Sequence, residues 1–169
     1  HDMTDIQEVC ERLLLVASNR GLRGVRLIPA DANEAALAQS LYANASLQEL
    51  PGFFGQTVDA LDAYLTIGKR LSLPVDLAEG TLLQRAVWLA IARVPYGETI
   101  SYTTLADRVG FPRAIRAVAS ACGANPVPLA IPCHRIIAKD GSLGGFSLGG
   151  LDVKERLLAL EQPMQVAVA

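Results

Sequence analysis

Residues 101–123 read SYTTLADRVGFPRAIRAVASACG, and this stretch decides the fold of the second half of the chain. Ser101 is a favourable helix N-cap, so a helix is predicted over residues 102–109. The Gly110-Phe111-Pro112 segment interrupts that helix with a turn, and a second short helix is predicted over residues 114–123. A helix, a glycine-containing turn and a helix at this length are typical of a helix-turn-helix.

The second predicted helix carries few side chains that could recognise a DNA sequence. A helix in the major groove normally offers Asn, Gln, Arg or Lys to the base edges. Arg116 is the long polar side chain of this helix, and the others are small: Ala114, Ala117, Ala119, Ser120 and Ala121. Small side chains suit close approach to a minor groove, where sequence is read poorly. They equally suit tight packing against neighbouring helices, and the sequence leaves both interpretations open.

Basic residues gather around this motif, although the chain as a whole carries a net charge of −2. Residues 101–139 contain five basic residues and one acidic residue, which gives this segment a net charge of +4. The remainder of the chain therefore carries a net charge of −6. The basic residues are Arg108, Arg113, Arg116, Arg135 and Lys139. A local positive patch is compatible with phosphate binding, and an ordinary solvated helix face would have the same composition.

The overall composition predicts a folded cytoplasmic protein. Apolar residues make up 51% of the 169 positions and charged residues 19%, which allows a sizeable core in one domain or two small ones. No apolar run approaches the roughly 18 residues that span a membrane, and the start lacks the pattern of a secretion signal. The cysteines, Cys10, Cys122 and Cys133, are few and odd in number, which argues against a disulfide framework and for a reducing compartment.

The first half of the chain predicts a small α/β domain over residues 4–78 with a short antiparallel sheet. Apolar runs at residues 12–17 and 22–28 flank a Ser-Asn-Arg-Gly turn, which indicates a β-hairpin. Helical spacing of apolar residues predicts helices over residues 31–45 and 53–67. Residues 71–77 alternate but contain Pro74, so an edge strand or an extended linker is expected there.

The second half predicts a mostly helical domain over residues 79–163, with a winged-helix-like form of the helix-turn-helix. Thr81 should cap a helix that runs to about Val94, and a closing helix is predicted over residues 153–160, followed by Glu161. The whole chain is therefore expected to be of the α/β (α+β) class. Residues 1–3 resemble the remnant of an expression tag, and residues 164–169 are expected to form a tail.

The pentapeptide Ile131-Pro132-Cys133-His134-Arg135 is the strongest candidate for chemistry. A thiol becomes a good nucleophile as the thiolate, and an imidazole beside it could accept the proton. Side chains of adjacent residues on an extended backbone point apart, so a bridging water is expected between Cys133 and His134. An acid such as Glu161 would then orient the imidazole from its far side.

Two other interpretations of Cys133 remain open on its chemistry alone. A single cysteine is often an inert thiol of the core. It could also bind a metal, but only His134 stands near it, and no second Cys or His pair completes the four ligands of a structural zinc site. Neither a metal nor a cofactor is therefore expected.

Several motifs resemble those of the O6-alkylguanine-DNA alkyltransferases, also called methylated-DNA–protein-cysteine methyltransferases. The cysteine pentapeptide resembles the active-site motif of this family. Further signals follow the order of the family: Pro95-Tyr96-Gly97-Glu98-Thr99 with Ser101-Tyr102, Arg116-Ala117-Val118, Asn125-Pro126, Gly145-Phe146-Ser147, and residues 157–161. The resemblance covers about residues 80–161, and the first half is similar to the family only in layout.

The resemblance implies a DNA repair protein of which each molecule acts once. The helix-turn-helix would enter the minor groove of double-stranded DNA and flip out the alkylated guanine. Cys133 would accept the alkyl group irreversibly, with His134 as a water-bridged base and Glu161 as its orienter. Tyr102 would donate to guanine N3 as the alkyl group leaves, and Asn125 would tie the turn after the second helix to the active site.

The resemblance also assigns residues to DNA contact and to a substrate pocket. Arg116 matches the arginine that fills the space left by the flipped base. Further DNA contacts are expected from Ala114, Ala117, Ser120, Tyr102 and Arg135. The residues expected around the guanine are Cys122, Ile136, Phe146, Ser147 and Lys154. Phe146 departs from the tyrosine common in the family, and Leu148 makes the following loop one residue longer than in some members.

Three hypotheses for the activity follow. The favoured one is a monomeric alkyltransferase that repairs O6-methylguanine in DNA, with O4-alkylthymine as a second candidate substrate. A module that binds alkylated bases without transfer would keep all its activity in Cys133→Ala. A Cys–His thiol hydrolase would turn over many times, but apart from His134 the chain has only His1, in the segment that resembles a tag.

Overall fold

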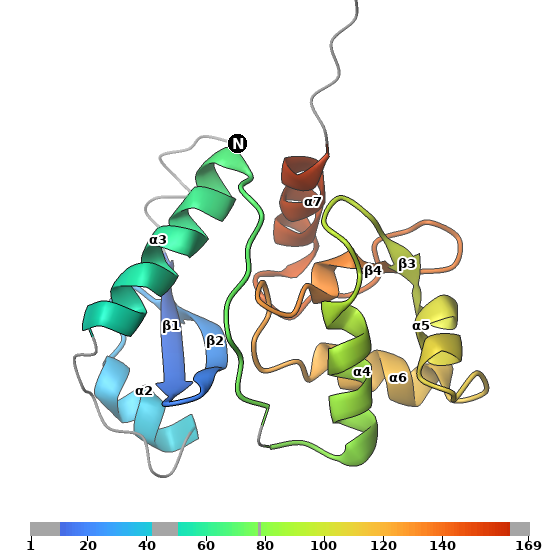
Figure 1. Cartoon of the computed structure of the whole chain (residues 1–169), viewed down its shortest axis with the longest axis horizontal. Coiled ribbons are helices and arrows are strands. Elements are labelled where there is room, and N and C mark those ends of the chain that lie inside the picture. The colour runs from blue at the N-terminus through green and yellow to red at the C-terminus, as the bar shows by residue number, and fades with distance from the viewer. Residues whose placement is uncertain (1–10, 42–50, 78, 163–169) are drawn as a thin grey trace, which may run out of the picture.

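The computed structural model describes residues 11–41, 51–77 and 79–162 of the chain, in two groups of elements with an extended segment between them (Figure 1). The first group contains β1 (Glu11–Ser18), β2 (Gly21–Pro29), α2 (Glu34–Leu41) and α3 (Pro51–Ile67). The second contains α4 (Leu82–Ala92), β3 (Ile100–Ser101), α5 (Tyr102–Arg108), α6 (Ile115–Gly123), the 3₁₀ helix η1 (Cys133–Arg135), β4 (Ile136–Ile137) and α7 (Gly150–Glu161). Helices combined with a small antiparallel sheet confirm the predicted α/β class.

The predicted hairpin is confirmed. Strands β1 and β2 pair antiparallel, with Leu13 opposite Leu27 and an irregularity in the register between Val16 and Ala17. Val25 and Ile28 of β2 are 3% and 5% exposed, and because they are three residues apart they lie on opposite faces of the hairpin. Both faces are therefore partly covered, and a slip by one residue would exchange the side chains between them.

Both predicted helices of the first half form, with different bounds. Helix α2 begins at Glu34, where the side chain of Asn33 accepts a hydrogen bond from the backbone N–H of Ala36. It is described as far as Leu41, and residues 42–45 of the prediction lie outside the described residues. Helix α3 turns Leu61 and Tyr64 toward the interior, where both are almost fully buried.

The segment after α3 is extended, as predicted. Leu22 of β2 bonds to it through both backbone groups, donating to the carbonyl of Pro74 at 2.9 Å and accepting from the N–H of Asp76 at 2.7 Å. The contact is an isolated parallel bridge between Leu22 and Val75. Pro74 has no N–H to donate, and its carbonyl alone enters the pairing.

Capping side chains start the helices of the second half where the sequence predicts. Thr81 and Gln84 form a reciprocal capping box at α4, and the hydroxyl of Ser101 accepts a hydrogen bond from the N–H of Thr104 at α5. Helix α6 follows the turn after α5. Helix α7 begins at Gly150, three residues before the predicted start at residue 153, and ends at Glu161.

The winged-helix detail of the prediction is not confirmed. Strands β3 and β4 pair in parallel over only two residues each. The segment after β4 makes a turn in which Ala138 and Ser142 are hydrogen bonded, and no antiparallel strand pair follows it within the described residues. The helix-turn-helix is therefore supported by loops and by α4, not by a β-wing.

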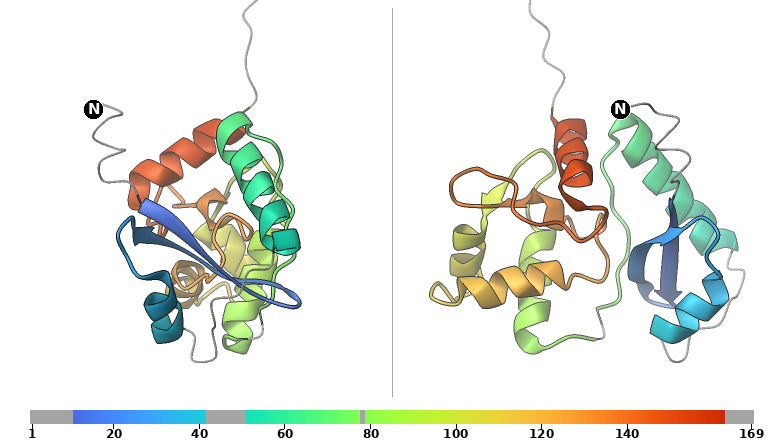
Figure 2. Two further views of the ribbon diagram at one scale, coloured as in Figure 1. Left: turned by 90° about the vertical axis from the view of Figure 1, so that its left-hand side faces the viewer. Right: turned by 180° about the vertical axis from the view of Figure 1, so that it is seen from behind.

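One hydrophobic cluster joins the two groups of elements. Leu22, Val25, Leu61 and Tyr64 of the first half belong to the same buried cluster as Val87 and Trp88 of α4, among others. Trp88 also donates its indole N–H to the carbonyl of Ala121 at 2.8 Å, which fixes α4 against α6. Figure 2 shows α7 beside α3, where these halves meet.

The division into domains 4–78 and 79–163 stays a prediction. No helix among the described residues has the length and apolar character to cross a bilayer.

Candidate active site

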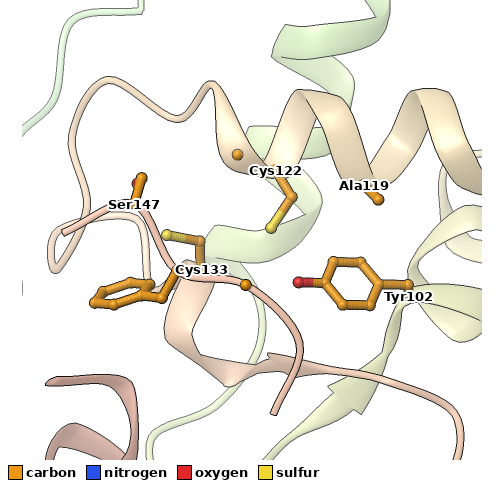
Figure 3. A pocket seen from close by; sticks show the side chains of 8 residues that line it. Tyr102, Ala119, Cys122, Cys133 and Ser147 are labelled. Atoms are coloured by element: carbon orange, nitrogen blue, oxygen red, sulfur yellow. The ribbon is translucent and has the colours of Figure 1, made fainter. Parts of the chain in front are cut away.

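Cys133 lies at the wall of a cavity of about 460 Å³ between the helix-turn-helix and the loop before α7. Tyr102 comes from α5, Ala119, Cys122 and Gly123 come from α6, and Gly145, Phe146 and Ser147 come from the loop. In Figure 3, Tyr102 points its hydroxyl toward the side of the cavity where the two cysteines lie. The cavity is lined mostly by apolar and small groups, which suits a flat aromatic ligand.

The backbone at Cys133 is a tight turn, which corrects the expectation of an extended segment. The N–H of Cys133 donates to the carbonyl of Ile131 at 2.8 Å, and the N–H of Arg135 donates to that of Pro132 at 3.0 Å. Because a 3₁₀ helix turns about 120° per residue, successive side chains point in different directions. Cys133 lines the cavity, whereas His134 is fully buried and is not among the lining residues.

His134 belongs to a buried hydrogen-bond network centred on the carboxylate of Glu161. Its Nε2 lies 2.6 Å from Oε2 of Glu161 at the end of α7. Arg135 donates to both oxygens of the same carboxylate, from Nε at 2.8 Å and from Nη2 at 3.0 Å. Oε1 also accepts the backbone N–H of Gly97, and Oε2 accepts the hydroxyl of Tyr64 at 2.5 Å.

The network keeps Glu161 ionised and His134 neutral. Burial by itself would raise the pKa of Glu161, but hydrogen bonds from His134, Arg135 and Tyr64 outweigh it and hold the pKa far below its usual range. Burial lowers the pKa of His134, and the neighbouring Glu161 only partly offsets this. A neutral imidazole bound to Glu161 carries its proton on Nε2, which leaves Nδ1 as a proton acceptor.

Nδ1 of His134 is buried and has no hydrogen-bond partner among the described residues. Buried polar atoms are nearly always paired, so this nitrogen is suited to bind a water or another small donor. Such a donor would connect Nδ1 to the thiol of Cys133, the next residue in the chain.

The thiol of Cys133 is protonated at rest. Burial raises its pKa, although the side chain of Asn125 and the positive charge of Lys154 act in the opposite direction. Burial also raises the pKa of the neighbouring Cys122, to about 12. Cys133 therefore needs a base to become a nucleophile.

Lys154 of α7 fixes the loop that closes the cavity. Its side chain is fully buried, and Nζ donates to the carbonyls of Ile136 at 2.5 Å and Gly145 at 3.1 Å. Gly144 precedes this anchor with a positive φ of 69°, and a Cβ there would lie 3.1 Å from the ring of Tyr102. Glycine allows both the backbone conformation and the close approach.

Helix α6 has one packed and one exposed face. Val118, Ala121 and Cys122 are buried, whereas Arg116, Ala117 and Ser120 are exposed and Ala114 is half-buried. The packing interpretation is therefore confirmed for one face of α6, and approach of the other face to a minor groove stays a prediction.

Known proteins are similar to this chain in sequence and in fold. Residues 82–163 match the family model described as 6-O-methylguanine DNA methyltransferase, DNA binding domain. The chain is 48% identical over 111 residues to a methylated-DNA–protein-cysteine methyltransferase of Methanosarcina barkeri, in an alignment that covers 65% of this chain and 69% of that relative. The chain belongs to the methylated-DNA–protein-cysteine methyltransferase family.

Two further similar proteins are a longer relative and a solved structure. The chain is 42% identical over 141 residues to the regulatory protein ada of Salmonella typhimurium, and the alignment covers 82% of this chain but 39% of that protein. The chain thus spans less than half of that relative. A crystal structure of OGT from Mycobacterium tuberculosis in complex with DNA has a TM-score of 0.72 and 36% identity, and the match covers 89% of this chain and 86% of that one.

The structure brings many of the predicted site residues together. Tyr102, Cys122, Cys133, Phe146 and Ser147 line one cavity. The carboxylate of Glu161 and the ring of His134 meet as expected. Ile136 and Lys154 do not line the cavity but lie behind it, where the lysine bonds to the Ile136 carbonyl.

Arg135, which was predicted to contact DNA, lies in the buried network around Glu161 and not on the surface. Its guanidinium is bound to Glu161 and, from Nη1, to the carbonyl of Val94 at 2.7 Å, and the residue is only 9% exposed. A count of charges along the sequence treats every arginine as a surface group, and this one neutralises a buried carboxylate instead. The surface patch keeps Arg108, Arg113, Arg116 and Lys139, all exposed.

Sequence reasoning missed Tyr64. It lies in the periodic apolar pattern of α3, which indicates a core position, and no motif surrounds it. Its hydroxyl nevertheless donates a hydrogen bond to Glu161, which lies 97 positions later in the sequence.

Among the described residues, no group of three or more His, Cys, Asp or Glu side chains is arranged to hold a metal ion.

Proposed function

We propose that this chain repairs DNA by transferring an alkyl group from O6 of guanine to the sulfur of Cys133, irreversibly and once per molecule. The observation that carries the proposal is the position of Cys133, which lines an apolar cavity and precedes a histidine bound to a buried carboxylate. Relatives that are 48% and 45% identical to the chain are named methylated-DNA–protein-cysteine methyltransferases.

The chemistry requires a thiolate and an aligned alkyl carbon. The Cys133 proton passes through a bridging water to Nδ1 of His134, and the imidazolium formed is stabilised by Glu161. The sulfur attacks the alkyl carbon, so an S–C bond forms as the O6–C bond breaks. The electron pair stays on the guanine, and Tyr102 donates to N3 as the charge develops. The thioether is stable, which makes the protein a reagent and not a recycling catalyst.

Access to a base inside a duplex requires extrusion of the nucleotide. The exposed face of α6 approaches the minor groove with Ala114, Ala117 and Ser120, and Arg116 fills the space that the base leaves. The crystal structure of the similar M. tuberculosis OGT in complex with DNA supports DNA as the partner. The chain is proposed to act as a monomer, since the residues that line the cavity all come from one chain. The flipped guanine enters beside Phe146 and Ser147, where Phe146 stacks but offers no hydroxyl.

Mass spectrometry after incubation with duplex DNA containing O6-methylguanine tests the proposal. We expect a single added methyl group, and fragmentation of the peptide that contains both Cys122 and Cys133 should locate it on Cys133. The Cys133→Ala variant should bind the lesion without gaining a methyl group. Absence of a methyl group on the unaltered protein, or its location on another cysteine, would overturn the proposal. Full activity in Cys133→Ala would favour a module that binds alkylated bases without transfer.

A further inference from the structure

We propose that Tyr64 of α3 is a positioning residue for the proton relay of Cys133, and that it acts through Glu161 and His134. The inference rests on the proposed alkyl transfer and extends it. The residues of the relay lie in the second half of the chain, whereas Tyr64 comes from the first half. The first half would thus contribute to reactivity as well as to the core.

The contacts of the Tyr64 hydroxyl are specific. It donates to Oε2 of Glu161 at 2.5 Å, and its oxygen lies 3.2 Å from Nε2 of His134. Oε2 is the same oxygen that accepts from His134. Tyr64 is 1% exposed, so neither contact is weakened by competing solvent.

The hydroxyl controls how strongly Glu161 attracts a proton on His134. A carboxylate oxygen that already accepts a phenol hydrogen has less negative charge to offer to an imidazolium. Tyr64 therefore keeps His134 less basic than Glu161 alone would make it. A neutral His134 at working pH retains the free lone pair on Nδ1, and that lone pair is what the Cys133 proton needs.

Other charged and titratable groups around His134 act together with Tyr64. Glu161 and Lys154 belong to α7, and Arg135 and Cys133 belong to the same turn as His134. The positive charges of Arg135 and Lys154 also disfavour a proton on His134. Replacement of Tyr64 by Phe leaves all four groups in place, so it isolates the hydroxyl.

A tyrosine that only fills the core would need its ring and not its hydroxyl. The ring of Tyr64 packs edge-on against that of Tyr96, with centroids 6.4 Å apart and planes at 84°. Tyr64→Phe keeps this packing and removes one oxygen. Tyr96→Phe is the matched control, because the Tyr96 hydroxyl donates to the carbonyl of Gly68 and is not bonded to Glu161 or His134.

The first test is an NMR titration of the histidine rings in the protein without DNA. The chain has two histidines, His1 and His134, so assignment is simple. In Tyr64→Phe we expect the pKa of His134 to rise by about one pH unit, the size expected for losing one hydrogen bond to a charged group. Tyr96→Phe should titrate as the unaltered protein does. An unchanged or lowered His134 titration in Tyr64→Phe would overturn the proposal.

The second test is the pH profile of single-turnover methyl transfer at saturating methylated DNA. We expect the low-pH limb of the rate profile to move to higher pH in Tyr64→Phe. A loss by the same factor at every pH would indicate a structural role alone and would also overturn the proposal. Because the titration needs no DNA, it still tests Tyr64 if the unaltered protein transfers no methyl group.

A replacement that should shift the pKa of His134 in the opposite direction distinguishes the proposed effect from a folding defect. An ortho-fluorine makes a phenol more acidic and a stronger donor, so 3-fluorotyrosine at position 64 should lower the pKa of His134. The unfolding midpoint of each variant is measured alongside. A fluorinated protein that is folded and has a raised His134 pKa would contradict the proposal.

Discussion

Asn125 donates its side-chain amide to the carbonyl of Ile131 at 2.8 Å, and its Oδ1 accepts the N–H of Val127 at 3.0 Å. The two bonds close the chain between α6 and η1 into a defined loop. A single buried side chain thereby fixes the distance between the helix proposed to contact DNA and the nucleophile. The loop also lies next to the cavity, because α6 ends just before it.

The first prediction concerns this loop. Asn125→Ala should lower the free energy of unfolding by about 1–3 kcal/mol, because it leaves the buried N–H of Val127 without its acceptor and removes one of the two donors to the carbonyl of Ile131. It should also slow methyl transfer, since the loop would no longer hold Cys133 in place. Asn33→Ala is the control, because it removes an exposed N-cap bond and should cost about 1 kcal/mol without changing transfer. Equal transfer by both variants would contradict the role of Asn125.

Arg135 should behave as a structural residue. Arg135→Ala removes both side-chain bonds to Glu161 that Arg135 makes, and breaking a buried ion pair of this kind costs about 3–5 kcal/mol. We expect a large drop in the unfolding midpoint in urea, measured without DNA. A variant of unchanged stability with weakened DNA binding would restore the original prediction of a DNA contact.

Arg116 should behave in the opposite way. Its side chain is exposed on α6, so Arg116→Ala should leave stability within about 0.5 kcal/mol of the unaltered protein. Repair should fall more on duplex than on single-stranded DNA, because only a duplex has a stack to refill. Arg156→Ala, an exposed arginine of α7, serves as the control. Equal losses on both substrates would refute the proposed role.

Signals that are local in the sequence were sufficient to predict the helices and the hairpin. They were insufficient to predict the buried hydrogen-bond network around Glu161. Thr81, Ser101 and the Ser-Asn-Arg-Gly turn act on neighbouring backbone, so their effects are readable from sequence. The contact of His134 with Tyr64 joins positions 70 apart, and its contact with Glu161 joins positions 27 apart. Such meetings depend on how helices pack. Glu161 was predicted because His134 needs an acid to orient it and because residues 157–161 resemble a family motif, and Tyr64 had neither aid.

Acid should destabilise the protein through this network. The pKa of His134 is lowered in the folded state from 6.5, so the stability it contributes is present above about pH 6.5 and is lost as pH falls through the folded pKa. The pKa of Glu161 is lowered from 4.5, which adds a second loss below about that pH. We expect the free energy of unfolding to fall steadily with acidification. His134→Gln should remove the first part of the decline, and a steeper decline in that variant would contradict the assignment.

Lys154 provides the last prediction, because it bonds to carbonyls on two sides of the cavity loop. Lys154→Met keeps the length and apolar body of the side chain but leaves the carbonyls of Ile136 and Gly145 without their donor. We expect a loss of about 1–3 kcal/mol in the free energy of unfolding and faster hydrogen exchange at residues 145–147. Methyl transfer should slow while binding to unmethylated duplex stays the same, because the loop shapes the pocket and α6 is the helix proposed to contact DNA. Lys139→Met, at an exposed position in the preceding turn, should change none of these measurements. Unchanged exchange at residues 145–147 in Lys154→Met would show that the loop is held by other contacts.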